Sequence, residues 1–264
     1  MTDVVVSAEW LDEHRADANV RIVDVRDEWE FEGIGHVPGA VNIPFDSFRA
    51  ADGDEGMLPG EDVFADLLGE AGIERGDEIV AYDDTHGVFA ARFLVTAVLY
   101  GHDRAKLHLL DGDYSAWGRG HETTGEPTAV DPATYDLERA DETVLVGREA
   151  VAAAVEDDDT LLVDTREAWE YEEGHIPGAI QFGWREFVDD ETRGLKGREA
   201  IEGILESHGI TRDRRVLLYC NTARRISHTY LVLRHLGFED LGFYEGSLTE
   251  WEDADGAIET SEAE

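Results

Sequence analysis

The stretch VRIVDVRDEWEFEGIGHVPGA at residues 20–40 decides the fold, because it recurs at residues 160–179 as TLLVDTREAWEYEEGHIPGA. Two further blocks recur in the same order: IVAY at 79–82 as VLLY at 216–219, and LDGDYSAW at 110–117 as YEGSLTEW at 244–251. Self-similarity at such a spacing indicates repeated structural units. A chain of 264 residues suits two domains of about 100–150 residues each. The chain is therefore predicted to be two copies of one domain.

The composition of the connecting segments suggests where the domains end. Residues 120–127 are rich in glycine, threonine, proline and charge, which is typical of a linker. We expect a first domain over residues 1–120 and a linker over 121–141. The second domain is expected over residues 142–252, followed by an acidic tail over 253–264.

Within each copy, short apolar runs alternate with amphipathic stretches. The runs predicted to be buried strands are Val20–Val23, Ile79–Tyr82, Lys106–Leu110, Leu161–Val163, Val216–Tyr219 and Asp240–Tyr244. The stretches predicted to be helices are Val63–Ala71, Ala91–Tyr100, Ala200–His208 and Ser227–Leu236. Such alternation indicates an α/β fold in which each domain has a parallel sheet with helices on both faces. Ligands of such sheets bind beyond the carboxyl ends of the strands, which places Tyr82 and Tyr219 next to the expected site.

The charge balance excludes several classes of partner. The chain carries 61 acidic and 22 basic residues, a net charge of −39, and only two of the basic residues are lysine. Such a surface repels nucleic acid and anionic membranes, so neither is an expected partner. The acidic residues are spread along the whole chain, as in proteins of salt-loving archaea. Because salt screens self-repulsion, we expect the fold to be more stable in concentrated salt.

Neither the N-terminal segment nor the cysteine content points to an extracellular protein. The N-terminus has no basic segment followed by an apolar run, and the longest apolar stretch, 89–100, is too short to span a membrane. The single cysteine excludes an internal disulfide. A cytoplasmic location is expected.

Cys220 is the candidate nucleophile. It follows the strand that ends at Tyr219, and the turn Cys220–Arg225 leads into the next predicted helix. Backbone N–H groups, the positive end of a helix dipole and the charges of Arg224 and Arg225 all favour the thiolate form of a cysteine in this setting. The same groups would stabilise a persulfide anion. A buried, inert cysteine is the alternative, which the two arginines make less attractive.

From Val4 to Trp251 the chain resembles the two-domain rhodanese (thiosulfate sulfurtransferase) family. The resemblance is carried, in order and twice over, by the Asp-x-Arg motifs at 24–26 and 164–166, the Gly-His-x-Pro-Gly-Ala turns, the Asp/Glu-Gly motifs after residues 110 and 244, and the Tyr219-Cys220 loop. It implies two tandem rhodanese-like domains and a Cys220 that carries sulfur as a persulfide. The resemblance also implies a small-molecule sulfur donor and a cyanide, thiol or protein acceptor, with no cofactor and no metal.

The first copy is expected to lack chemistry of its own, because Asp83 stands where Cys220 stands in the second. The pairs Asp24/Arg26 and Asp164/Arg166 occur in both copies and are interpreted as structural ion pairs, and His36 and His175 as turn residues.

Donor binding is assigned to residues in and near the second copy's loop. They are Asn221, Thr222, Ala223, Arg224, Arg225, Trp184 and Arg185. One of the two loop arginines is alternatively expected to pair with a carboxylate and orient the loop. Members of the family that use thiosulfate often carry an arginine four residues after the second Asp-x-Arg arginine, whereas this chain has Glu170 there. The identity of the donor is therefore open, with 3-mercaptopyruvate as the alternative.

Two other functions are considered. A phosphatase or arsenate reductase on a related fold needs an arginine six residues after the cysteine, where this chain has Ile226. A non-catalytic sulfur carrier or sulfide sensor would use the same persulfide, so the sequence leaves that alternative open.

Overall fold

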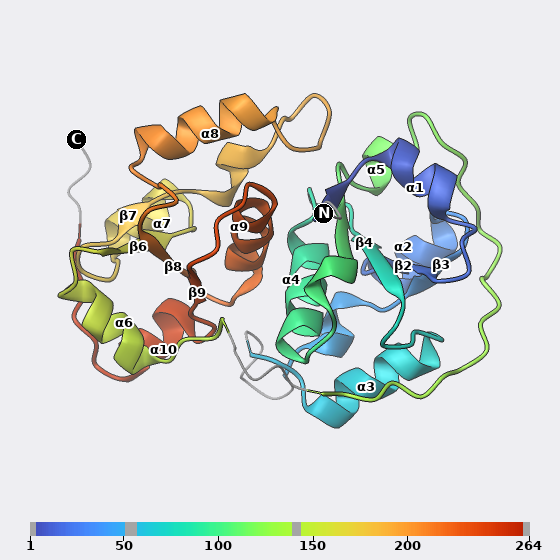
Figure 1. The fold of residues 1–264 in the computed structure, drawn as a ribbon, viewed down its shortest axis with the longest axis horizontal. Coiled ribbons are helices and arrows are strands. Elements are labelled where there is room, and N and C mark those ends of the chain that lie inside the picture. Colours follow the sequence, from blue (N-terminus) through green and yellow to red (C-terminus); the bar gives the residue numbers. More distant parts are fainter. Residues whose placement is uncertain (1–3, 51–56, 139–143, 261–264) are drawn as a thin grey trace. The chain divides into compact units, whose positions relative to one another are not determined.

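The computed structural model describes residues 4–50, 57–138 and 144–260. The chain divides into two compact units, Met1–Asp141 with Asp189–Leu195, and Glu142–Val188 with Lys196–Glu264 (Figure 1). The ends of the expected linker and tail, residues 139–141 and 261–264, and the first residues of the expected second domain, 142–143, lie outside the described residues.

The first unit contains a five-stranded, all-parallel sheet in the order β1-β5-β4-β2-β3. The strands are β1 (Val5–Val6), β2 (Val20–Asp24), β3 (Ala40–Asn42), β4 (Glu78–Tyr82) and β5 (Leu107–Leu110). Its helices are α1 (Ala8–His14), α2 (Glu28–Gly33), α3 (Glu61–Glu70), α4 (Val88–Leu99) and α5 (Tyr114–Trp117), with 3-10 turns at η1 (Phe45–Phe48) and η2 (Arg104–Lys106).

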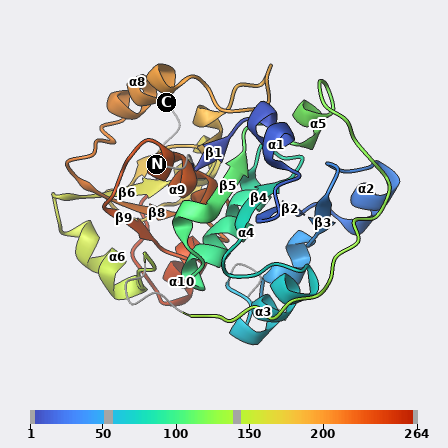
Figure 2. The same ribbon diagram turned by 45° about the vertical axis from the view of Figure 1, so that its right-hand side comes forward.

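Alternating side chains of these strands build a core on each face of the sheet. Ile22 and Tyr82 pack in one cluster with Leu11 of α1 and Trp117 of α5. The neighbouring strand residues, which point the other way, are buried as deeply, and α4 lies against β4 and β5 on that side (Figure 2). A sheet covered on both faces explains why its strands read as continuous apolar runs.

The second unit repeats this plan with four described parallel strands in the order β7-β6-β8-β9. They are β6 (Thr160–Asp164), β7 (Ile180–Gln181), β8 (Arg215–Tyr219) and β9 (Leu241–Phe243). The helices are α6 (Arg148–Val155), α7 (Ala168–Glu173), α8 (Arg198–Ser207), α9 (Arg224–His235) and α10 (Ser247–Asp253), with a 3-10 turn η3 (Trp184–Phe187). Leu217 and Tyr219 pack with Val151 of α6 and Trp251 of α10, whereas α9 contacts β8 from the other face.

The motifs found twice in the sequence play matching structural parts. Arg26 forms a buried ion pair with Asp24 at 2.5 Å, and Arg166 pairs with Asp164 at 2.6 Å. Each arginine also donates to a backbone carbonyl at the start of the Gly-His-x-Pro-Gly turn, that of Gly35 or Gly174. The predicted structural role of these pairs is confirmed.

The two turn histidines also act alike. His36 exchanges backbone hydrogen bonds with Thr124, and His175 exchanges them with Glu259. Their rings stack on those of Phe31 and Tyr171, at 3.7 Å between ring centroids in each case. Each histidine therefore fixes a turn against the segment that follows its domain, as predicted.

The segment expected to be a linker follows the surface of the first unit over its described part. Besides Thr124, the N–H of Ala133 donates to the carbonyl of Gly69, and the buried Tyr135 lies with its hydroxyl 2.7 Å from Nδ1 of His102. Among the described residues, no helix combines the length and the apolar character that crossing a membrane requires.

The predicted α/β fold is confirmed, and the predicted strands and helices all form, with ends within one to three residues of the expected ones. One difference matters for the site. The helix after Cys220 begins at Arg224, not at Ser227, so Arg224 and Arg225 form its first turn. The short strands β1, β3 and β7 and the helices α1, α2, α5, α6, α7 and α10 were not predicted, because two- to eight-residue elements carry little periodic signal.

Candidate active site

Cys220 lies directly after the central strand β8, in the loop that leads into α9. Its side chain is a free thiol with 1% exposure. The loop reverses direction through Ala223, whose left-handed backbone (φ 61°) is unusual for a residue with a side chain. The hydroxyl of Ser227 donates to the Ala223 carbonyl at 2.7 Å, which secures this conformation.

The backbone of Cys220 is held from both sides by the start of α10. Its N–H donates to the hydroxyl of Ser247 at 3.1 Å, and its carbonyl accepts from the N–H of Leu248 at 2.9 Å. Ser247 in turn donates to the carbonyl of Tyr244, and the hydroxyl of Thr249 donates to the carbonyl of Asn221. Sequence reasoning missed Ser247 and Thr249, although both lie in the repeated block at residues 244–251.

Glu170 connects the loop to α7. The Arg225 guanidinium binds its carboxylate through both terminal nitrogens, one of them at 2.9 Å, and the Asn221 amide donates to the same carboxylate at 3.0 Å. The Glu170 carboxylate also accepts the N–H of Glu167 at 3.0 Å. Arg225 is thus the loop arginine that pairs with a carboxylate, one of the two alternatives predicted.

The charges around this pair support one another. Burial disfavours the Glu170 carboxylate, but the hydrogen bonds from Arg225 and Glu167 and the charge of Arg225 outweigh it and lower the pKa of Glu170. Burial likewise disfavours the Arg225 cation, but Glu170 and, after it, a negative charge on Cys220 raise the pKa of Arg225. Both members of the pair are therefore held in their charged forms.

The remaining predicted site residues lie around the loop with different contacts. The Nε of Arg224 donates to the hydroxyl of Thr222 at 3.4 Å. Trp184 is buried in η3, with its ring 5.4 Å from that of His228 on α9, and the Arg185 guanidinium lies 5.1 Å above the Trp184 ring. The structure thus joins Asn221 and Arg225 through Glu170 and places Trp184 and Arg185 beside α9. Donor binding by any of them stays a prediction.

The matching loop of the first copy shows what this turn can bind. Asp83, 1% exposed, occupies the position of Cys220. Its carboxylate accepts four backbone N–H groups, from Thr85 at 2.7 Å, Gly87 at 2.8 Å, Phe89 at 2.7 Å and Ala90 at 3.0 Å. Burial raises the pKa of Asp83 against the effect of these bonds. The turn is therefore a cradle for an anion, which the first copy supplies from its own side chain.

The two loops follow the same course but differ by one residue in length. Both leave the strand after a tyrosine, and both enter a helix through a left-handed N-cap residue, Gly87 (φ 84°) for α4 and Ala223 (φ 61°) for α9. The first loop has an additional left-handed residue, His86 (φ 56°). Counted from the helix starts, the N–H groups of Ala223, Arg225 and Ile226 take the places of those of Gly87, Phe89 and Ala90. We expect them to face the sulfur of Cys220 as the others face the Asp83 carboxylate.

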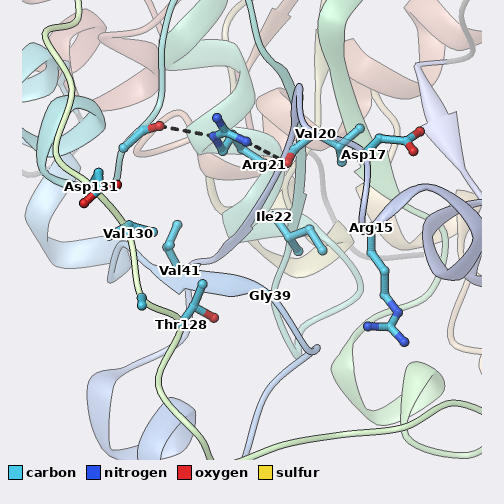
Figure 3. Close-up of a pocket in the computed structure, with 12 residues that line it drawn as sticks. Arg15, Asp17, Val20, Arg21, Ile22, Gly39, Val41, Thr128, Val130 and Asp131 are labelled. Atoms are coloured by element: carbon cyan, nitrogen blue, oxygen red, sulfur yellow. Dashed lines mark hydrogen bonds between the residues drawn. The ribbon is translucent and has the colours of Figure 1, made fainter.

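Other features of the described residues offer no competing centre. Within residues 4–50, 57–138 and 144–260, no three His, Cys, Asp or Glu side chains are grouped as a metal site requires. A cavity of about 370 Å³ in the first unit lies between β2, β3 and the segment 128–131 (Figure 3). Its two arginines, Arg15 and Arg21, are paired with Asp12 and Asp77.

Comparison with known proteins gives a consistent family. The sequence pattern of the Rhodanese-like domain matches residues 7–119 and again 148–254. The chain is 30% identical over 272 residues to the sulfur carrier protein TtuD of Thermus thermophilus, covering 94% of this chain and 93% of that one. It is 30% identical over 277 residues to a Haloferax volcanii protein named "Putative thiosulfate sulfurtransferase", covering 97% and 95%.

Solved structures have the same fold. The crystal structure of the 3-mercaptopyruvate sulfurtransferase SseA from Escherichia coli superposes with a TM-score of 0.80 at 24% identity, over 93% of this chain and 99% of that one. The wild-type structure of EanB superposes with a TM-score of 0.87 at 18% identity, over 98% of this chain and 70% of that one.

Proposed function

Since the chain belongs to the rhodanese-like family, with sulfurtransferases and a sulfur carrier among its relatives, we propose that it transfers sulfane sulfur through a persulfide on Cys220. The proposed donor is thiosulfate or a related compound such as 3-mercaptopyruvate, and the proposed acceptor is cyanide or a thiol.

The proposed reaction has two displacement steps. In the first, the Cys220 thiolate attacks the outer sulfur of thiosulfate, a new S–S bond forms, and sulfite leaves with the electron pair of the old S–S bond. In the second, cyanide or an acceptor thiolate attacks the terminal sulfur of the persulfide. The Cys220 thiolate leaves, and the product is thiocyanate or a persulfide of the acceptor.

The observation that carries the proposal is the anion cradle at this turn. The Asp83 carboxylate shows that the turn of the first copy binds a buried negative charge through four N–H groups. At the corresponding place in the second copy, such groups would stabilise both the thiolate and the terminal sulfur anion of the persulfide. Hydrogen bonds of this kind favour the thiolate and the persulfide anion over their protonated, neutral forms.

Donor recognition is assigned to positive charge and aromatic surface near the loop. The charge of Arg225 is partly balanced by Glu170, so Arg224 and Arg185 are the other proposed contacts for an anionic donor. Trp184 is proposed to form an apolar wall. The acid at position 170, where an arginine is common in thiosulfate-using members, leaves 3-mercaptopyruvate as an alternative donor.

The likeness to a sulfur carrier supports a second candidate, in which the Cys220 persulfide is passed to a protein acceptor. Both candidates share the first step and differ in the second. Thiocyanate production from thiosulfate and cyanide, measured in molar KCl, separates them: rapid turnover supports the enzyme, and a stable persulfide released only to a protein supports the carrier. Cys220→Ser should abolish either reaction, and retained transfer in that variant would refute the proposal.

A further inference from the structure

The two copies of the domain share a glutamate that has an additional set of partners in only one of them. Glu30 and Glu170 are the third residues of α2 and α7, and each accepts a hydrogen bond from the N-cap backbone, of Asp27 at 3.2 Å or Glu167 at 3.0 Å. This capping box satisfies an N–H that the helix itself leaves without an acceptor. Capping alone therefore explains a glutamate in both copies.

The contacts of the two glutamates with the neighbouring loops differ. Glu170 is 9% exposed and accepts hydrogen bonds from Arg225 and Asn221. In the first copy the corresponding positions are Phe89, the second residue of α4 as Arg225 is of α9, and Asp84, which follows Asp83 as Asn221 follows Cys220. Neither has a side chain that can donate to a carboxylate. The contacts of Glu170 with the loop therefore belong to the copy that has the nucleophile.

The two loop partners of Glu170 bracket the turn that carries the cradle. Asn221 follows Cys220 directly, and Arg225 lies five residues after it. Between them is Ala223, whose left-handed backbone persists only when its surroundings hold it. A carboxylate that binds both ends of this short turn restricts how far the intervening N–H groups can move away from the sulfur.

The same contacts place a negative charge against Arg225, which lies in the turn that begins at Cys220. Two hydrogen bonds direct its guanidinium toward Glu170, whose negative charge offsets the positive one. An unbalanced cation beside a thiol favours the thiolate, whereas a balanced one favours it less. Glu170 thus affects both the geometry and the charge of the loop through the two residues that donate to it, Arg225 and Asn221.

From these observations we propose that Glu170 is a positioning residue of the Cys220 loop. It holds Asn221 and Arg225 at the two ends of the turn and limits the effect of the Arg225 charge on the thiol. This proposal rests on the proposed sulfur-transfer function, because the Cys220 loop that Glu170 positions is the loop assigned to sulfur transfer.

The test compares two substitutions of Glu170 with the same substitutions of Glu30. Glu170→Gln keeps an oxygen that can accept from Asn221 but removes the charge opposite Arg225. Glu170→Ala removes the cap and both loop contacts. Glu30→Gln and Glu30→Ala are matched controls, because they alter a capping box in the copy without the nucleophile.

The first measurement is a titration of the Cys220 thiol, followed by the ultraviolet absorbance of its thiolate after subtraction of the Cys220→Ser spectrum. Glu170→Gln should move the midpoint to lower pH, because the charge of Arg225 is no longer balanced. Glu30→Gln should leave the midpoint unchanged. A merely structural role for Glu170 would not shift the midpoint in Glu170→Gln, so an unchanged value would overturn the electrostatic part of the proposal.

The second measurement is the single-turnover rate of persulfide formation from thiosulfate. We expect Glu170→Ala to lower this rate by about tenfold to a hundredfold, as for other small displacements of reacting groups. Glu170→Gln should recover part of the loss, and Glu30→Ala should stay within about twofold of the unsubstituted protein. A normal rate in Glu170→Ala would overturn the positioning role.

The two measurements also separate this proposal from the proposed function. If the unsubstituted protein takes up no sulfur, the proposed function fails, and the thiol titration still decides whether Glu170 acts on Cys220. If sulfur transfer occurs but neither measurement responds to Glu170, only the positioning role is refuted.

Discussion

The two copies of the domain have similar turns after the central strand, but the first residue of the turn is Asp83 in one copy and Cys220 in the other. In the first copy the Asp83 carboxylate, covalently part of the turn, accepts the four N–H groups of the cradle. In the second copy a thiol stands at that position, and α10 and Glu170 hold the loop around it. The comparison indicates that the strand–turn–helix geometry provides the anion cradle. The first residue of the turn then differs: it carries a carboxylate in the first copy and a thiol in the second.

The residues packed against the two turns also differ between the copies. Ser247, which binds the backbone of Cys220, corresponds to Asp113 in the first copy. Asp113 is fully buried and accepts hydrogen bonds from Arg193 at 2.6–2.9 Å. Arg193 belongs to the segment Asp189–Leu195, which groups with the first unit although it comes from the second repeat of the sequence. The first copy thus has a buried carboxylate in an ion pair where the second has a serine that binds the backbone of Cys220.

The largest expected effect comes from making the second turn resemble the first. Cys220→Asp should reduce sulfur transfer to the background rate, because a carboxylate cannot carry sulfane sulfur. If the two cradles are equivalent, the new carboxylate will accept the N–H groups of α9, and the melting temperature in molar KCl should change by only a few degrees. A strongly destabilised variant would show that the second turn is not an anion cradle.

The reverse experiment empties the first cradle. Asp83→Ala leaves four N–H groups, two of them buried, without their acceptor and should lower the free energy of unfolding by about 2–4 kcal/mol. Urea unfolding at constant high salt measures this loss. The control is Asp84→Ala, whose partly exposed carboxylate binds Ser115 and pairs with Arg193 at 3.5 Å, and whose removal should cost about 1 kcal/mol, less than that of Asp83. Equal losses in the two variants would contradict a special role for Asp83.

A smaller effect on the free energy of unfolding is expected from breaking the ion pair between Arg193 and Asp113, since the second copy has Ser247 in place of Asp113. Burial disfavours the Asp113 carboxylate, but its hydrogen bonds from Arg193 lower the pKa of Asp113 below the ordinary value. A lowered carboxyl pKa adds stability at pH values above the ordinary one, near 3.9, and this stability is lost as the pH falls through the folded-state pKa. Arg193 is partly exposed, so Arg193→Ala should cost about 1–3 kcal/mol at pH 7.

The pH dependence of the stability lost in Arg193→Ala tests whether this loss comes from the charge of the arginine. The difference in unfolding free energy between the unsubstituted protein and Arg193→Ala should shrink as the pH is lowered below about 4. A difference that stays constant over this range would mean that packing of the arginine, not its charge, stabilises the first unit.

The smallest expected effect is that of salt on the melting temperature, and it should apply to both copies of the domain. With a net charge of −39, repulsion between surface carboxylates acts over about 10 Å in 0.1 M salt but only about 3 Å in 1 M salt. We expect the melting temperature to rise by at least a few degrees between dilute buffer and molar KCl, and to rise less with an uncharged solute of equal osmolality. Identical melting temperatures in dilute buffer and molar KCl would refute the adaptation to salt.

Much of the fold was predictable, because the repeated blocks coincide with buried strands and with turns that both copies need. The ion pairs of Arg26 and Arg166 were predictable for the same reason, since a motif found in both copies cannot depend on the nucleophile. The start of α9 was predicted three residues too late, because the apolar periodicity begins at Ile226 while the helical backbone begins at Arg224. Caps and first turns seldom contribute to periodicity.

The parts of the site that were missed depend on contacts between residues distant in the sequence. Glu170 stood out as a departure from a family pattern, but its pairing with Arg225 crosses 55 residues and follows only from the packing of α7 against the loop. Likewise, the sequence of the first copy shows that an aspartate stands at the position of the cysteine. Only the structure shows that four backbone N–H groups donate to the carboxylate of this Asp83.

The central claim is that Cys220 alone accepts sulfur at a cradle built by the turn. The most direct measurement is mass spectrometry of the protein after incubation in high salt with thiosulfate or 3-mercaptopyruvate. We predict one added sulfur atom on the peptide that contains Cys220, removed again by cyanide and absent from Cys220→Ser. An unmodified Cys220 peptide under conditions in which the protein transfers sulfur would contradict the account.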